Sequence, residues 1–266
     1  MNNLKKKVII LTGGLGLIGK KLTLFLAQKG AQVIVLDIKS LKEFKKIKDF
    51  KTIKNINYFK CDVSNLKSLK KALPRILKIS KKIDVLINNA ALNDSLEKNP
   101  SVKLSKFENF PENFWNESIK INLNSLFLCS QIFGKEMIKY NNGSIINIAS
   151  TYGMVGPDQK IYQNKKLKNI FYKNPAYPTA KGGVISFTKY LASYWGKNGI
   201  RVNCISPGGI ENKQEKNFIK NYSSKTLIGR MGKVEDLFGV IKLLCNKESS
   251  YITGTNFVVD GGWTAI

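Results

Sequence analysis

The sequence predicts an α/β domain in which helices cover both faces of a doubly wound parallel sheet of about seven strands. Short apolar segments alternate with amphipathic segments, which is the pattern of strands joined by crossover helices. Most of the apolar segments are nearly continuous in Val, Ile and Leu, as expected for parallel strands buried on both faces. Neither an internal repeat nor a linker divides the 266 residues, so we expect a single domain spanning residues 1–266.

Seven segments are predicted as strands because they are short and rich in β-branched residues. They are Val8–Leu11, Val33–Leu36, Tyr58–Cys61, Val85–Ile87, Ser144–Ile148, Arg201–Ile205 and Asn256–Val259. Amphipathic segments predict helices near residues 17–29, 64–79, 112–139, 178–196 and 233–246. In such a fold, ligands bind at the carboxyl ends of the strands.

Residues 157–174 interrupt the alternation. The segment begins at Pro157 and continues as a run rich in Lys, Asn and Tyr without clear periodicity. We expect a long loop, and long loops in compact domains are often functional.

The composition is strongly basic, since 44 Lys and Arg residues against 18 Asp and Glu residues give a formal net charge of +26. A basic chain suggests nucleic-acid binding. Only three of these residues are arginine, however, and arginine is the side chain that clamps phosphates and reads guanine edges. Because the lysines are also spread along the whole chain, we expect no nucleic-acid partner, although the charge would attract anionic substrates.

Several locations and chemistries are disfavoured by composition. No apolar run approaches the roughly 20 residues of a membrane helix, and the apolar residues after the N-terminal lysines are too few for a signal peptide, so a cytoplasmic protein without membrane contact is expected. Four widely spaced cysteines argue against a zinc site or a disulfide framework. The absence of histidine excludes Ser-His-Asp hydrolases and H-E-x-x-H metalloproteases, which leaves acid–base chemistry to tyrosine, lysine or carboxylates.

A glycine-rich turn, Thr12-Gly13-Gly14-Leu15-Gly16-Leu17-Ile18-Gly19, joins the first predicted strand to the first predicted helix. Its glycines permit a tight turn and close approach of the backbone to a pyrophosphate, and the helix N-terminus attracts phosphate. The turn therefore predicts a dinucleotide site, although a glycine turn can also merely link strand to helix. The expected contacts are Gly13, Gly16, Leu17, Ile18 and Gly19.

Asp37 ends the second predicted strand, 24 residues after Gly13, where an acid would meet the adenosine ribose. A carboxylate there accepts hydrogen bonds from ribose hydroxyls and repels a 2′-phosphate, so NAD is favoured over NADP. The alternative is a helix-capping aspartate. Further cofactor contacts are expected after the third and fourth strands, from Asp62, Val63, Asn89 and Ala90.

Tyr177 and Lys181 stand four residues apart in a predicted helix, which places both side chains on one face. An ammonium beside a phenol favours the phenolate, so we expect the pKa of Tyr177 to lie well below its usual value of about 10. Such a tyrosine can exchange a proton with an alcohol near neutral pH. The spacing is also that of an ordinary solvated helix face. The glycine-rich turn, together with Ser150 at the end of an apolar strand, favours the catalytic interpretation.

These residues together resemble the short-chain dehydrogenase/reductase family, in its short single-domain branch. The resemblance covers nearly the whole chain and implies a Rossmann-type sheet, a nicotinamide cofactor, hydride transfer to or from a carbonyl or alcohol, and a homotetramer or homodimer. The motifs that carry it are Thr12-Gly13 to Gly19, Asp62, Asn88-Asn89-Ala90, Asn122, Ser150, Tyr177-x-x-x-Lys181, Pro207-Gly208, Tyr251-Ile252-Thr253-Gly254 and Asp260-Gly261-Gly262.

The resemblance also implies residue roles. Tyr177 is expected to be the general acid–base, with Lys181 lowering its pKa and holding the nicotinamide ribose. Ser150 is expected to hydrogen-bond the substrate oxygen, and Asn122 to hold a water that relays protons from Lys181. The residues expected around the nicotinamide are Pro207, Gly208 and the main chain of Ile210.

One departure from the family concerns spacing. Ser150 and Tyr177 are 27 positions apart, about twice the family's usual interval, and the additional residues are those at 157–174. We infer an insertion that shapes the substrate pocket, with Tyr162, Gln163 and nearby lysines available to polar or phosphorylated groups. The alternative is a surface or subunit-contact loop.

The predicted function is NAD-dependent hydride transfer to or from a polar secondary alcohol or ketone. Segments at 152–159, 194–197 and 261–265 resemble a bacterial subgroup associated with flagellin modification and surface-sugar biosynthesis, so a sugar or sugar derivative is the expected substrate. The enzymatic alternative is a 3-oxoacyl-carrier-protein reductase. An alternative of another class, a non-catalytic nucleotide-binding scaffold, is disfavoured by the presence of all four expected catalytic residues.

Overall fold

The computed structural model describes residues 4–92, 102–164, 169–170 and 172–266. Within these ranges, seven parallel strands form one sheet in the order β3-β2-β1-β4-β5-β8-β9. The sheet confirms the predicted doubly wound α/β fold. Its strands are β1 (Val8–Thr12), β2 (Gln32–Asp37), β3 (Ile56–Lys60), β4 (Val85–Asn88), β5 (Gly143–Ile148), β8 (Ile200–Pro207) and β9 (Asn256–Val259).

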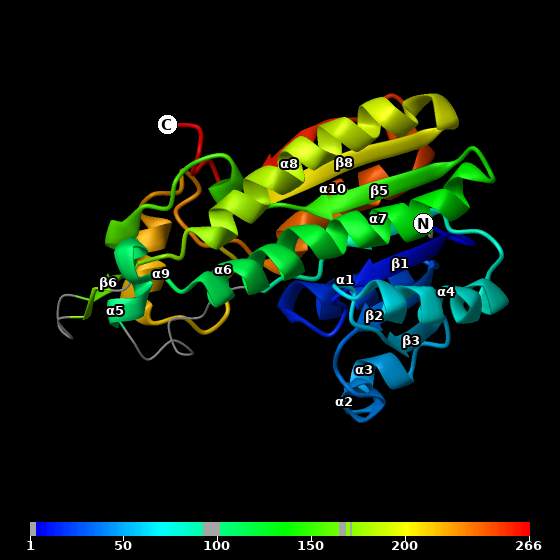
Figure 1. Cartoon of the computed structure of the whole chain (residues 1–266), viewed down its shortest axis with the longest axis horizontal. Helices are drawn as coiled ribbons and strands as arrows, with labels where there is room; N and C mark the ends of the chain where they lie inside the picture. The colour runs from blue at the N-terminus through cyan, green and yellow to red at the C-terminus, as the bar shows by residue number, and fades with distance from the viewer. Residues whose placement is uncertain (1–3, 93–101, 165–168, 171) are drawn as a thin grey trace.

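Helices cover both faces of the sheet (Figure 1). The longer ones follow the predicted segments closely: α1 (Leu17–Gln28), α4 (Leu66–Ile79), α6 (Glu112–Ile119), α7 (Ser125–Ile138), α8 (Ala176–Trp195) and α10 (Phe238–Cys245). Four helices were not predicted: α2 (Leu41–Lys45), α3 (Lys48–Lys51), α5 (Val102–Ser105) and α9 (Lys216–Ser223).

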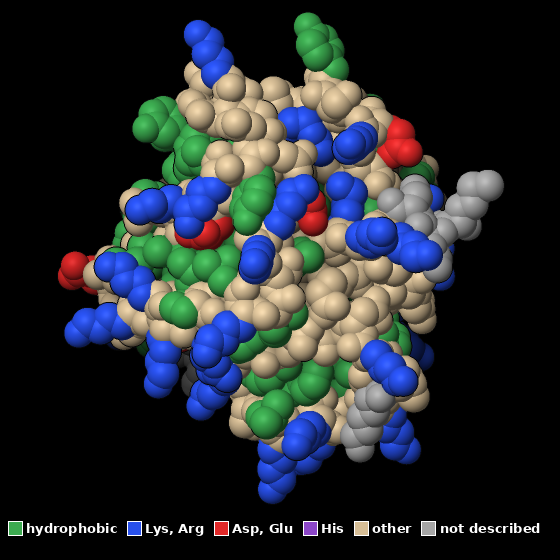
Figure 2. Space-filling model, turned by 90° about the vertical axis from the view of Figure 1, so that its right-hand side faces the viewer, with side chains coloured by type: hydrophobic (Ala, Val, Ile, Leu, Met, Phe, Trp, Pro, Cys, Tyr) green, Lys and Arg blue, Asp and Glu red, His purple; other side chains and the backbone are tan. Residues whose placement is uncertain are grey.

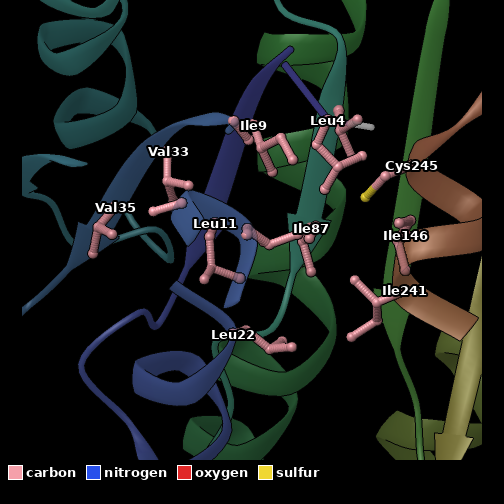
Figure 3. Close-up of a cluster of buried hydrophobic side chains, with 14 of the residues drawn as sticks. Leu4, Ile9, Leu11, Leu22, Val33, Val35, Ile87, Ile146, Ile241 and Cys245 are labelled. Atoms are coloured by element: carbon pink, nitrogen blue, oxygen red, sulfur yellow. The ribbon is translucent and has the colours of Figure 1, made fainter. Parts of the chain in front are cut away.

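The core has two layers, one on each face of the sheet, because successive side chains of a strand point to opposite faces. Along β1, Ile9 and Leu11 pack into the layer under α1 and α10, whereas Val8 and Ile10 pack into the layer under α4, α7 and α8. Figure 3 shows the first of these layers, in which Leu22 of α1 and Ile241 of α10 approach the strands. Burial of apolar strand residues on both faces fixes the sheet and therefore the positions of the loops at its carboxyl edge.

The order in which strands are added to the sheet reverses at β1, since β2 and β3 lie on one side of β1 and β4 lies on the other. β1 pairs with β2 on one side and with β4 on the other, so the loops that follow β1 and β4 leave in opposite directions. A crevice at the carboxyl edge of such a switch point is where open α/β sheets bind their ligands.

The predicted helix at 112–139 is not continuous. A π-helical turn at Lys120–Asn124 separates α6 from α7, and Asn122 lies within this turn. Single π turns inside helices are rare and occur frequently at functional sites.

The segment predicted as a long loop, residues 157–174, contains short regular elements. The segment contains a 3-10 turn at Gln159–Tyr162 and a small antiparallel pair, β6 (Gln163–Asn164) with β7 (Asn169–Ile170). Its described residues lie at one end of the molecule, near α5 and α9, where α8 begins (Figure 1). Lys165, Lys166 and Lys168, among the lysines proposed for substrate contact, lie outside the described residues, and Gln163 is described only in its main chain.

The basic residues are distributed over the surface. Figure 2 shows Lys and Arg side chains spread across one face with few acidic side chains between them. None of the helices in the described ranges is both long and apolar enough to span a membrane.

Candidate active site

The glycine-rich turn lies at the switch point and packs as tightly as its sequence predicts. A Cβ atom on Gly19 would stand 2.1 Å from the carbonyl oxygen of Gly13, so only glycine allows the first turn of α1 to approach β1 this closely. Gly13 has a φ of 65° and also borders Ala90, whose Cα would lie 2.8 Å from an added Cβ. The turn therefore brings the ends of β1 and β4 together.

The N-terminus of α1 is open to a ligand. Gly16 is its N-cap and provides no side-chain cap, and both Gly16 and Leu17 are exposed. The first N–H groups of a helix have no partner within the helix, and together with the helix dipole they attract an anion. The bare backbone at this position fits the pyrophosphate of a dinucleotide.

Asp37 lies beside this turn at the end of β2. Its carboxylate accepts hydrogen bonds from the main-chain N–H of Leu15 at 2.8 Å and of Lys39 at 3.1 Å. The Leu15 contact joins the acid to the glycine-rich turn, which an ordinary helix-capping aspartate would not do. A carboxylate has about four acceptor positions, so these two bonds leave capacity for ribose hydroxyls.

The other cofactor contacts predicted after the third and fourth strands take different positions. The exposed Asp62 accepts hydrogen bonds from the main chain and hydroxyl of Ser64, whereas Val63 is buried in the core. Asn89 donates from its side chain to the carbonyl oxygens of Thr12 and Gly13, at 3.0 and 3.1 Å. Its amide group therefore braces the glycine-rich turn.

Tyr177 stands in the first turn of α8. Asn174, just before the helix, accepts a hydrogen bond from the Tyr177 main-chain N–H at 2.8 Å. Pro178 follows Tyr177 without loss, because the first turn of a helix needs no N–H partner. The phenol ring is half-buried, and the Lys181 ammonium lies 5.6 Å from its centroid. The two residues thus share one helix face, as predicted.

Lys181 is 3% exposed, and its ammonium donates a hydrogen bond of 2.7 Å to the main-chain oxygen of Ile148 at the end of β5. Removal from water disfavours the charged form, and burial lowers the pKa of Lys181 to about 8.

Ser150 follows β5 and begins a 3-10 turn, Thr151–Gly153, that packs directly on α8. A Cβ on Gly153 would lie 2.6 Å from the Lys181 carbonyl carbon, so glycine permits this contact. The Ser150 hydroxyl is nearly buried and accepts from the main-chain N–H of Tyr152 at 3.2 Å, which leaves its proton free to be directed elsewhere. The turn brings Ser150 to the helix that carries Tyr177 and Lys181.

Asn122 is buried, and its side-chain amide forms two hydrogen bonds with the main chain of Leu92. The amide oxygen accepts from the Leu92 N–H and the amide nitrogen donates to the Leu92 carbonyl oxygen, each at 3.0 Å. These bonds anchor the π turn to the segment that follows β4. The water relay expected for Asn122 stays a prediction.

The segment after β8 is held in an extended form. An isolated parallel bridge pairs Ile210 with Gly232, using the carbonyl of Gly209 and the N–H of Glu211. In such a bridge the N–H of the central residue, Ile210, points to the opposite side. Pro207 is buried, and Gly208 packs so closely on Asp260 that a Cβ would lie 2.9 Å from the Asp260 Cα.

The insertion is connected to both the catalytic turn and α9. Tyr162 donates a hydrogen bond of 2.7 Å to the hydroxyl of Tyr152, and its ring lies 5.6 Å from that of Phe218 on α9. Asp158 forms an ion pair with Lys225, just beyond α9. These contacts tie the insertion to the turn that bears Ser150 and to α9, and its role in shaping the substrate pocket stays a prediction.

The same insertion lines a cavity of about 220 Å³ next to the start of α8. Its lining residues are Ser105, Phe107, Pro157, Gln159, Tyr172, Lys173, Asn174, Pro175 and Pro178. Two of them, Pro175 and Pro178, flank Tyr177 in sequence.

Sequence reasoning missed Lys173. This lysine is 7% exposed, and its ammonium lies 4.6 Å from the centroid of the Tyr177 ring, closer than that of Lys181. It belongs to the insertion and to no motif, so no signal in the sequence separated it from the neighbouring lysines.

Fold and site together define a nucleotide-dependent oxidoreductase, with a dinucleotide crevice at the switch point and a lysine–tyrosine pair at its rim. A family model described as enoyl-(acyl carrier protein) reductase matches residues 16–264. The chain belongs to the short-chain dehydrogenase/reductase family, whose members are NAD(P)-dependent enzymes acting on CH–OH groups.

Individual relatives agree with this assignment. An NAD-dependent glycerol dehydrogenase of Listeria innocua is 32% identical over 98% of this chain and 95% of its own length. A 2-dehydro-3-deoxy-D-gluconate 5-dehydrogenase of Bacillus subtilis is 30% identical over 98% and 96%. The crystal structure of a short-chain dehydrogenase from Leptospira borgpetersenii with bound NAD⁺ is similar with a TM-score of 0.86 at 35% identity, covering 99% of this chain and 94% of that chain.

Proposed function

We propose that this enzyme transfers a hydride between NAD and a polar secondary alcohol or ketone, with a sugar or sugar derivative as substrate. The observation that carries the proposal is the position of Tyr177 on one helix face with Lys181, next to the turn that bears Ser150. The tyrosine–lysine pair supports proton exchange with a carbinol oxygen, and the crevice beside Gly13 supports dinucleotide binding.

In the oxidation direction, Tyr177 as the phenolate accepts the hydroxyl proton of the substrate, and Ser150 donates a hydrogen bond to the same oxygen. A nicotinamide held in the crevice would supply the acceptor for the hydride that leaves the carbinol carbon. Lys181 keeps a positive charge near the phenolate, which lowers the free energy of the deprotonated tyrosine. In the reduction direction, Tyr177 returns the proton to the developing alkoxide.

The choice of NAD rests on Asp37. Its carboxylate is held at the glycine-rich turn by the hydrogen bond from the Leu15 main-chain N–H. A 2′-phosphate bound there would meet the negative charge of this carboxylate. The name of the Listeria relative, an NAD-dependent enzyme, and the NAD⁺ bound to the Leptospira protein agree with this choice.

The substrate class rests on the polar character of the site and on its relatives. The hydroxyl groups of Tyr152, in the turn after β5, and Tyr162, in the insertion, are hydrogen-bonded to each other. Hydroxyl groups suit the recognition of a substrate that is itself rich in hydroxyl groups. The relatives are named for a polyol and a keto sugar acid. We place the enzyme in surface-glycan or flagellin modification, on the resemblance of residues 152–159, 194–197 and 261–265 to that subgroup. Assembly as a homotetramer or homodimer in the cytoplasm belongs to the same proposal.

A 3-oxoacyl-carrier-protein reductase is a second candidate, favoured by the acyl-carrier description of the matching family model and by the basic surface (Figure 2). Acidic carrier proteins would be attracted to a net charge of +26. Asp37 opposes this candidate, because such reductases usually use NADPH.

The test combines cofactor binding with turnover. Fluorescence titration with NADH and NADPH measures the cofactor preference, and NADH formation is followed with polyols, sugars and sugar acids. We expect NADH to bind more tightly and Tyr177→Phe to lower kcat by about 100-fold or more while retaining NADH binding. Tyr140→Phe, remote from the site, is the matched control.

The alternative functions predict different outcomes of the same experiments. Preference for NADPH with turnover of an acylated carrier protein would support the carrier-protein reductase. NADH binding without turnover of any substrate would support a scaffold, and undiminished activity of Tyr177→Phe would remove Tyr177 from the assigned role.

A further inference from the structure

We propose that Lys173, supplied by the insertion, is a second cation that stabilises the phenolate form of Tyr177. It acts through Tyr177 and is therefore a positioning residue for proton transfer, and the inference rests on the proposed role of Tyr177 as the acid–base. The consequence is that the insertion tunes the reactivity of the site.

Two ammonium groups approach the same phenol ring. The Lys173 ammonium lies 4.6 Å from the ring centroid and the Lys181 ammonium lies 5.6 Å from it. Both distances are within the range of about 6 Å in which a cation over an aromatic face is attracted to it. Lys173 precedes α8 and Lys181 lies within it. The ring therefore has one ammonium group from the insertion and one from the helix.

The position of Lys173 is fixed by its neighbours. Its main-chain N–H donates to the side-chain oxygen of Gln159 at 2.8 Å, which ties the end of the insertion to its beginning. The next residue, Asn174, is 4% exposed and accepts from the Tyr177 main-chain N–H. Lys173 itself is 7% exposed, so its charge is largely removed from water, where screening would weaken it.

The electrostatics favour the phenolate. A neutral phenol attracts a cation over its face only through its quadrupole. Deprotonation adds a net negative charge that is shared between the oxygen and the ring, so the same cation is attracted more strongly by the phenolate. Because the stabilisation is larger for the deprotonated form, Lys173 shifts the equilibrium toward it.

Among the residues that the structure describes, the other groups placed against Tyr177 do not oppose this effect with charge. Tyr152, from the turn after β5, and Tyr162, from the insertion, interact electrostatically with Tyr177, and burial raises the pKa of both, so both are neutral near pH 7. Asp158 at the start of the insertion is paired with Lys225. On α6 and the π turn, which pack against α8, the charged side chains are exposed: Glu112, Glu117 and Lys120.

The test reads Tyr177 directly and needs no substrate. The ultraviolet absorbance of phenolate is titrated with pH in the full-length wild type, and the signal of Tyr177→Phe is subtracted to isolate Tyr177. The same pair is measured in the Lys173→Met background, which keeps the length of the side chain and removes its charge. Lys173→Arg tests rescue by another cation, and Lys160→Met removes an exposed lysine of the same insertion as the matched control. Circular dichroism checks that each variant is folded.

We expect Lys173→Met to raise the titration midpoint of Tyr177 by about one pH unit, Lys173→Arg to restore it, and Lys160→Met to leave it unchanged. Equal midpoints in the wild type and in folded Lys173→Met would overturn the proposal. If Lys173→Met unfolds, Lys173→Arg decides: a midpoint within a few tenths of the wild-type value supports the role of charge, and a midpoint raised despite the retained charge overturns it.

Turnover distinguishes this role from substrate binding. Once an active substrate is found, Lys173→Met is expected to lower kcat and to move the pH profile of kcat/KM with the Tyr177 midpoint, for neutral and anionic substrates alike. A rise in KM confined to anionic substrates, with the midpoint unmoved, would overturn the proposal in favour of an anion contact. Failure of the proposed function is recognised separately, as loss of NADH binding or turnover in the wild type, with the Tyr177 midpoint still measurable.

Discussion

The Lys181 ammonium donates a hydrogen bond to the main-chain oxygen of Ile148 at 2.7 Å, and this buried bond joins α8 to the carboxyl end of β5. Ser150 stands two residues beyond Ile148, and Tyr177 stands one helical turn before Lys181. The bond therefore fixes the relative positions of the two segments that supply the proposed catalytic residues. Since Lys181 is removed from water by the same packing, position and pKa are set together.

We predict that the unfolding free energy of the wild type rises between about pH 8 and pH 10 relative to that of Lys181→Met. The pKa of Lys181 is about 8 in the folded chain. It is about 10.4 in the unfolded chain, so the unfolded chain binds more protons within this window. Stability then increases with pH, by at most about 1.4 kcal/mol per pH unit, and well below pH 8 the lysine contributes no slope because it is charged in both states. Urea unfolding at stepped pH measures the difference, and parallel curves for the two proteins would contradict the prediction.

The elements that the sequence predicted well are those with local and repetitive causes. The strands β1, β2, β4 and β5 are buried runs rich in Val, Ile and Leu, and the turn depends on Gly13 and Gly19, where an added Cβ would meet backbone atoms. Helix α2 had a local signal that was overlooked: Ser40 and Glu43 form a capping box. The helix was not predicted because lysines are so frequent in this segment that no apolar periodicity is evident.

The features that were not predicted depend on contacts between distant segments. Nothing near Asn122 in the sequence reveals a π turn, because the turn is held by bonds from Asn122 to Leu92, thirty positions away. Lys173 likewise looks like any lysine of a basic loop until the return of the insertion places it over Tyr177. The motifs were enough to propose candidate catalytic residues, whereas the electrostatic surroundings of these residues required the fold.

Gly19→Ala tests the close packing of the first turn. The new Cβ would lie 2.1 Å from the Gly13 oxygen and 2.7 Å from the Gly14 Cα, and these are backbone atoms that cannot move aside. We expect a loss of stability of about 2 kcal/mol or more and loss of NADH binding, measured by thermal unfolding and fluorescence titration. At Gly239 in α10 a Cβ meets nothing within 4 Å, so Gly239→Ala is the control and is expected to be neutral or stabilising by up to about 1 kcal/mol. Normal stability of Gly19→Ala would show that the turn can relax.

Asp37→Asn tests the cofactor preference. The substitution keeps an oxygen that can accept from the Leu15 N–H and removes the negative charge. We expect NADH affinity to fall about tenfold, because a charged acceptor for the ribose hydroxyls is lost, and NADPH affinity to be maintained or to rise. Fluorescence titration with both dinucleotides measures the ratio, and Asp49→Asn, an exposed acid on α3, is the control. An unchanged ratio would show that Asp37 acts only as a brace for the turn.

An exposed aromatic stripe on α8 predicts a subunit interface. The rings of Phe187, Tyr190 and Tyr194 are stacked along the helix, with centroids 6.3 and 5.9 Å apart, and Tyr190 and Tyr194 are 60% and 65% exposed. Clustered exposed aromatic side chains are typical of surfaces that are covered by a partner. We therefore expect the wild type to be a tetramer or a dimer that buries this stripe.

The double substitution Tyr190→Lys and Tyr194→Lys should split that assembly, because each new ammonium would have to be desolvated at the contact and would face like charges from the second copy. Light scattering coupled to size exclusion measures the mass, and the free subunit is expected to keep its helical circular dichroism. Tyr140→Lys adds the same charge at another exposed tyrosine, outside α8, and should leave the mass unchanged. A double variant that retains the wild-type mass would place the subunit contact elsewhere on the molecule.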